Sequence, residues 1–101
     1  RYNAAVGLAR HGRWEAAPVL LEMLDPRNVE AWDQESTDGG RDFKRSLVLA
    51  NGIRAAVELR EKADGAASND WDDLQAAMGR LAHDGTVPHR IRLDARAAQR
   101  D

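Results

Sequence analysis

Cysteine is absent from this chain of 101 residues. Without a thiol the chain has no disulfide, no thiolate ligand for a metal and no cysteine nucleophile. The absence leaves the compartment open, because a chain without cysteine is compatible with oxidising and reducing conditions alike. No apolar run approaches the about 18 residues that a membrane-spanning helix requires, so we expect no membrane span.

Neither sign of charge dominates the sequence. Lysine and arginine together number 15 against 17 acidic residues, which gives a net charge of −2. The chain therefore lacks the broad basic field typical of nucleic-acid-binding proteins, and nucleic acid is not the expected partner. Hydrophobic residues make up 43% and charged residues 32%, a balance that indicates one small domain folding in water.

Apolar residues recur at helical spacing, and no segment shows the two-residue alternation of a strand. The pattern predicts an all-α fold with five helices, over residues 1–11, 14–25, 41–62, 70–84 and 89–101. Gly12 and the pair Asp84-Gly85 are turn signals that end the first and fourth helices. The third helix is apolar nearly all round, so we expect it at the centre, with neighbours on more than one side.

Two strings carry a resemblance to a known family: RYNAAVGLARHG at residues 1–12, and WEAAPVLLEMLD at residues 14–25. They resemble the A and B helices of one unit in the bacterial HEAT-like repeat family. Asn3, Asn51 and Asp94 occupy similar positions 48 and 43 residues apart, a period typical of two-helix repeats. Each of the three is followed by a small residue, which permits close approach between helices.

The resemblance implies a right-handed α-solenoid of about two and a half HEAT-like helix pairs, with A helices on the convex side and B helices on the concave side. One repeat would span about residues 1–25 and a second about residues 41–84, separated by a long loop at residues 26–40. A half repeat would follow at residues 88–101. Because the chain starts and finishes inside predicted helices, we expect it to be a single segment of a longer polypeptide.

The sequence contains no recognisable set of catalytic or metal-binding residues. His11, His83 and His89 lack the spacing of metal ligands. The acidic stretch from Asp33 departs from the calcium-binding EF-hand pattern, which needs a glycine and a glutamate at fixed later positions. There is no nucleophile elbow and no glycine-rich phosphate loop. We therefore expect a protein that is not an enzyme and that holds no cofactor or metal.

The leading hypothesis is a non-catalytic scaffold that binds another protein through the outward side of its B helices. The expected contacts on those helices, with one tryptophan from the long loop, are Glu15, Glu22, Gln75, Arg80 and Trp32. The resemblance also extends to ligand- or nucleic-acid-handling enzymes of the bilin lyase and DNA glycosylase types. A structural spacer between other domains is the third hypothesis, because a fold alone does not settle a function.

Overall fold

A computed structural model describes residues 1–28, 37–63 and 68–99. Within these ranges the chain folds into five α-helices and one 3-10 turn. They are α1 (Tyr2–Arg10), η1 (Trp14–Ala16), α2 (Ala17–Met23), α3 (Asp38–Lys62), α4 (Ser68–Ala82) and α5 (His89–Ala98). The described ranges contain no strand, so the predicted all-α class and its five helices are confirmed.

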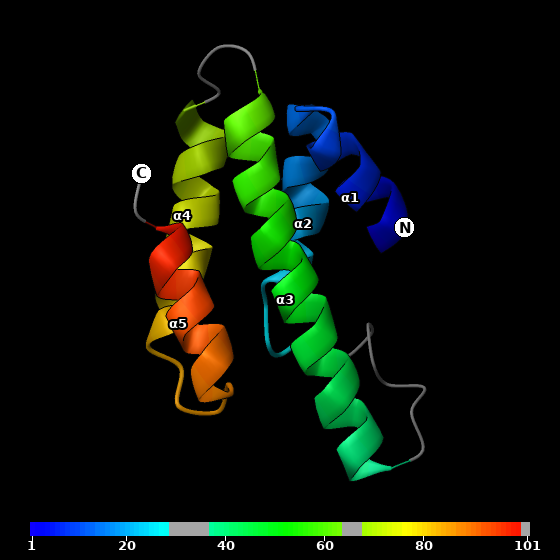
Figure 1. The fold of residues 1–101 in the computed structure, drawn as a ribbon, viewed down its shortest axis with the longest axis vertical. Helices are drawn as coiled ribbons and strands as arrows, with labels where there is room; N and C mark the ends of the chain where they lie inside the picture. Colours follow the sequence, from blue (N-terminus) through cyan, green and yellow to red (C-terminus); the bar gives the residue numbers. More distant parts are fainter. Residues whose placement is uncertain (29–36, 64–67, 100–101) are drawn as a thin grey trace.

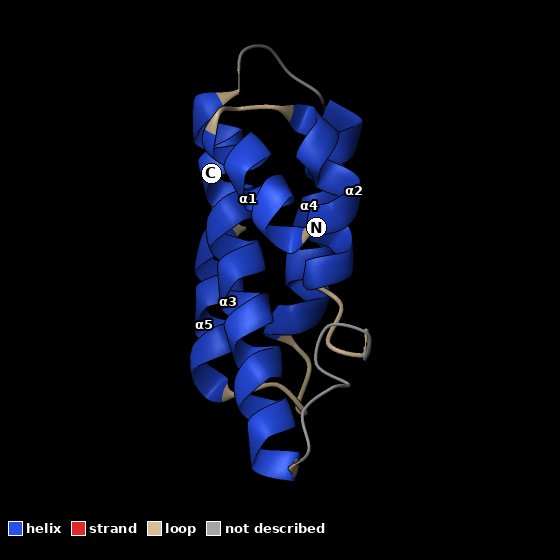
Figure 2. Cartoon of the chain, turned by 90° about the vertical axis from the view of Figure 1, so that its right-hand side faces the viewer, coloured by secondary structure: helices blue, strands red, loops and turns tan. Residues whose placement is uncertain are grey.

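The helices pack in two layers. The first layer consists of α1, α3 and α5, with α3 in contact with both of the others, and the second layer consists of α2 and α4 side by side (Figures 1 and 2). The chain runs in one direction along the helices of the first layer and in the opposite direction along those of the second (Figure 1). The result is a flat slab with extents of 43 × 27 × 16 Å.

The core lies between the two layers and is built from aliphatic side chains. The largest fully buried side chains come from α2 and the residue that follows it, from α3 and α4, and from the turn before α5: Leu20, Met23, Leu24, Leu49, Leu59, Leu74, Met78, Leu81 and Val87. Burying each such side chain stabilises the fold by about 1.5–3 kcal/mol. The outer helices of the first layer contribute smaller residues, such as Ala5, Ala9 and Ala95. As predicted, α3 is central, because it contacts every other α-helix.

Several helix boundaries differ from the prediction. α3 begins at Asp38, so the prediction that residues 26–40 form a loop is wrong for residues 38–40. The cause is Thr37, whose hydroxyl accepts a hydrogen bond of 2.9 Å from the backbone N–H of Gly40 and caps the helix. That cap outweighs the poor helix propensity of Gly39 and Gly40. Similarly, α4 begins at Ser68, two residues before the expected cap at Asp70.

Small residues allow close packing at two of the three positions that the repeat pattern relates. A Cβ atom on Gly52 would lie 3.1 Å from the Cβ of Met23, so α3 crosses the end of α2 at short range. Ala95 is completely buried on α5. Ala4, the third small residue, is exposed on α1. The similarity of the three segments therefore extends to packing in α3 and α5 but not in α1.

Candidate binding grooves

Two of the predicted contact residues form ion pairs within the chain. The carboxylate of Glu22 on α2 accepts two hydrogen bonds from the guanidinium of Arg1, at 2.7 and 2.5 Å. Glu15 in η1 accepts one from Arg13 at 2.6 Å. These hydrogen bonds hold the pKa of both glutamates below the ordinary value. Both carboxylates therefore stay ionised near neutral pH, and Glu22 helps to fasten the start of α1 to α2.

The two predicted contact residues on α4 have different surroundings. Gln75 is half-buried, and with its amide oriented to match its neighbours the oxygen accepts a 2.7 Å hydrogen bond from the indole N–H of Trp71. Its nitrogen donates to the backbone oxygen of Gln99 at 3.2 Å, so Gln75 connects α4 to the end of α5. Arg80 is exposed and lines a groove. Trp32, the fifth predicted contact, lies outside the described residues.

A cavity of about 320 Å³ lies between the C-terminal parts of α2 and α4. Its apolar lining comes from Leu21, Leu24, Pro26, Ala77 and Leu81, and its polar lining from Asp25, Arg27, Arg80 and Asp84. It adjoins an open depression of about 790 Å³, which shares Arg27, Arg80 and Asp84 and includes His83. We call the two together the second-layer groove. It combines an apolar floor with charges of both signs at the rim.

Asp84 fixes one rim of the second-layer groove. One carboxylate oxygen accepts hydrogen bonds from the backbone N–H and the hydroxyl of Thr86, at 2.9 and 2.7 Å. The other oxygen lies 3.5 Å from the guanidinium of Arg27. The bonds from Thr86, helped by Arg27 and Arg45, hold the pKa of Asp84 below its ordinary value. Arg45 of α3 also donates to the backbone oxygen of Thr86 at 2.6 Å, so this turn is tied to both layers.

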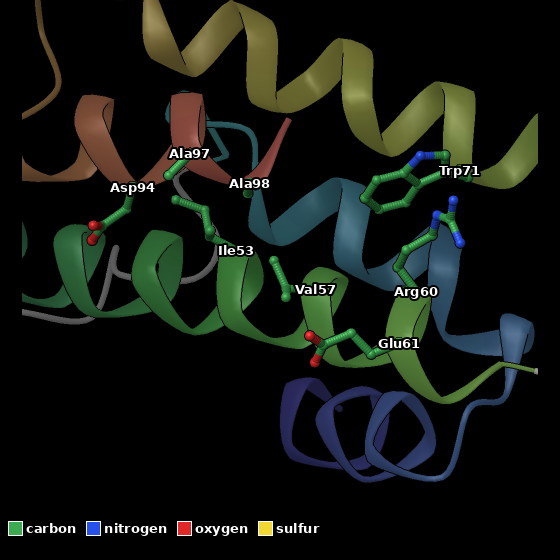
Figure 3. Close-up of a pocket in the computed structure, with 8 residues that line it drawn as sticks. All are labelled: Ile53, Val57, Arg60, Glu61, Trp71, Asp94, Ala97 and Ala98. Atoms are coloured by element: carbon green, nitrogen blue, oxygen red, sulfur yellow. The ribbon is translucent and has the colours of Figure 1, made fainter. Parts of the chain in front are cut away.

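A second groove, of about 340 Å³, lies where α3, α4 and α5 meet (Figure 3). We call it the Trp71 groove, and it is lined by Ile53, Val57, Arg60, Glu61, Trp71, Asp94, Ala97 and Ala98. The guanidinium of Arg60 stands over the indole of Trp71, 5.4 Å from the ring centroid, in a cation–π contact. Sequence reasoning missed this groove because its residues come from three helices and share no motif.

The described part of the chain offers no set of three His, Asp or Glu side chains placed to hold a metal ion. Nor does any helix in the described ranges have the length and apolar character needed to cross a membrane. No family model matches the chain, and no curated protein or solved structure matches it at a significant level. The two grooves and the arrangement of the helices are the features of this chain that bear on its function.

Proposed function

We propose that the chain is a protein-binding module built from HEAT-like helix pairs, and that a protein partner docks on its second layer. The alternation of α1, α3 and α5 with α2 and α4 supports this proposal, because stacked helix pairs in a solenoid alternate in the same way. Such stacks expose a continuous layer of helices, and extended surfaces of this kind are suited to binding other proteins.

The observation that carries the proposal is the second-layer groove. Leucines and an alanine form its floor, and Arg27, Arg80 and Asp84 stand at its rim. Protein interfaces typically combine a buried apolar centre with a polar rim, and arginine is enriched among the residues that contribute most to binding. A partner would insert an apolar side chain between α2 and α4 and meet the exposed Arg80 with a carboxylate or a carbonyl oxygen.

The carboxylates with altered pKa values favour binding over acid catalysis. A general acid at neutral pH needs a carboxyl group whose pKa is raised towards 7, which requires burial or a neighbouring negative charge. Glu15, Glu22 and Asp84 have pKa values shifted the other way, because each accepts hydrogen bonds from donors in the chain. Asp84 is suited to holding the rim of the second-layer groove in shape, and Glu22 to holding the start of α1 against α2.

A charge reversal in the groove tests the proposal. The immobilised protein is compared with Arg80→Glu, and proteins retained from a cell extract are quantified by mass spectrometry at two salt concentrations. Arg54→Glu is the matched control, because Arg54 is an exposed arginine on α3 in the other layer. We expect a partner that the wild type and Arg54→Glu retain at both salt concentrations and that Arg80→Glu binds about ten-fold more weakly when the purified pair is titrated.

Both variants should keep the melting temperature of the wild type within a few degrees, since both side chains are exposed. Equal retention by all three proteins would remove the second-layer groove from consideration. Nucleic acid retained at low salt and released at high salt would favour the nucleic-acid-handling alternative instead.

A further inference from the structure

The Trp71 groove lies along a flank of α3 that, among the described residues, α5 covers only in part. α5 packs beside α3 but ends at Ala98, while α3 and α4 extend beyond that point (Figure 1). α1 covers α3 on its other side. The open space therefore has helices as its walls and the C-terminal end of α5 at one end. A helix placed there would extend the row of the first layer.

The floor of the groove is apolar. Ile53 and Val57, one helical turn apart on α3, point into it, as do Ala97 and Ala98 from the end of α5 (Figure 3). Trp71 forms a wall from α4, and its indole is held in place by Arg60 on one side and by Gln75 at its N–H. Such a rigid surface suits aliphatic side chains at helical spacing, which enter a groove between helices as ridges.

The rim of the groove carries an excess of negative charge. Glu61 and Asp94 are both exposed, and in the part of the chain that the structure describes neither carboxylate has an ion-pair partner. Arg60 is the one cationic residue among the described residues that line the groove, so the two carboxylates outnumber the positive charges. The C-terminal end of α5 adds partial negative charge, because the last carbonyl groups of a helix lack helical partners.

We propose that the Trp71 groove binds a basic amphipathic helix of a partner protein. Leucine-like side chains of that helix would pack on Val57, Ala97 and the indole of Trp71, and its lysines or arginines would pair with Glu61 and Asp94. This binding site is separate from the second-layer groove and does not depend on it.

The test uses synthetic helical peptides as probes. The first is an amidated peptide of leucine and lysine, about 14 residues long, with leucines at helical spacing on one face. A scrambled peptide of the same composition keeps the charge and loses the apolar face. A third peptide has glutamate in place of lysine. Binding is followed by fluorescence anisotropy of the labelled peptide, and by the indole N–H signal of Trp71 in nuclear magnetic resonance spectra.

Two double variants separate the groove from general attraction between opposite charges. Glu61→Lys with Asp94→Lys reverses the rim, whereas Asp42→Lys with Asp73→Lys changes the net charge equally at exposed positions outside the groove. We expect the leucine–lysine helix to shift the Trp71 signal, and the rim variant to weaken binding about ten-fold or more. The control variant should weaken it by no more than about three-fold, because exposed charges at a distance are screened.

A second pair of variants tests the apolar floor. Ala97→Phe fills the groove and should abolish the Trp71 shift, while Ala4→Phe adds the same ring at an exposed position on α1 and should leave it intact. Circular dichroism confirms that each variant is folded. Equal binding of the scrambled peptide, tighter binding of the glutamate peptide, or equal loss in both double variants would overturn the proposal.

The peptide-binding measurement also separates this inference from the proposed function. Arg80→Glu should bind the leucine–lysine helix with unchanged affinity, because Arg80 does not line the Trp71 groove. A changed affinity in Arg80→Glu, with signal changes at Leu81 rather than Trp71, would place the peptide in the second-layer groove and overturn the inference.

Discussion

Single polar side chains hold the turns of this protein together. Asn28 donates to the hydroxyl of Tyr2 at 2.9 Å and to the backbone oxygen of Glu22 at 3.1 Å, so one amide joins the end of α2 to the start of α1. Asp84 has the corresponding role in the turn before α5, where it accepts two hydrogen bonds from Thr86. Asp84 makes its contacts within one turn, whereas Asn28 links α2 to a residue 26 positions earlier in the chain.

Asp84→Asn is expected to destabilise the protein by about 1 kcal/mol at neutral pH, because the turn loses a charged acceptor. The pKa of Asp84 is lower in the folded protein than its ordinary value of 3.8. As the pH falls, the carboxylate of Asp84 therefore takes up a proton in the unfolded chain before it does so in the folded protein. The stability that the carboxylate contributes is complete above the unfolded-state pKa and is lost as the pH falls through the folded-state pKa.

Urea denaturation of the wild type and Asp84→Asn measures this difference at several pH values. The difference in unfolding free energy between the wild type and Asp84→Asn should be constant between about pH 7 and 5 and should shrink below about pH 4. Asp72→Asn, on the exposed side of α4, is the matched control and should stay within about 0.5 kcal/mol of the wild type. A gap that does not change with pH would show that the carboxylate charge is not what stabilises the turn.

At the scale of helices and turns, two residues decide where an element begins or ends. Thr37 starts α3 through its side-chain cap. Gly12 ends the first helical segment with a positive φ of 71°, and its N–H donates to the backbone oxygen of Ala9 at 2.9 Å. A Cβ atom at this position would lie 2.6 Å from the backbone oxygen of Lys62. The turn before η1 therefore packs directly on the end of α3.

Gly12→Ala should destabilise the protein by about 2 kcal/mol, since the new methyl group meets both a left-handed backbone and the Lys62 carbonyl. Gly7→Ala is the matched control. Gly7 lies inside α1 with no atom within 4 Å of a built Cβ, so its replacement should stabilise the helix by about 0.5–1 kcal/mol. Thermal unfolding followed by circular dichroism measures both, and a neutral Gly12→Ala would mean that the turn does not need glycine.

Across the whole molecule, the place of a residue in the slab decides how much its side chain stabilises the fold, more than the residue type does. Leu47 and Leu49 lie two residues apart on α3, yet Leu47 is 49% exposed and Leu49 is fully buried. Phe43, one turn before Leu47, is 72% exposed. The first turns of α3 extend beyond α1 and α5, so their apolar side chains are not covered on every side (Figure 1).

Leu49→Ala should cost about 2–5 kcal/mol, because it leaves a cavity between the layers. Leu47→Ala, the same substitution on the same helix, should cost less than about 1 kcal/mol. The midpoints of urea denaturation of the two variants and the wild type measure both losses of stability. Similar losses in both would mean that Leu47 is covered in solution, for example by a second copy of the chain.

The sequence by itself determined the all-α class, the five helices, the central place of α3 and the turns at Gly12 and Asp84. These features follow from helical spacing and turn chemistry, which act between residues close together in the chain. Helical spacing also placed Arg80 among the expected contact residues.

Only the tertiary structure decided which faces are covered. It formed the Trp71 groove from α3, α4 and α5, assigned Gln75 to the contact between α4 and α5, and left Leu47 exposed beside the buried Leu49. Periodicity shows that a helix has an apolar face but not how far a neighbouring helix extends along it. That distance depends on contacts between residues remote in sequence, and it decides whether an apolar face becomes core or an open groove.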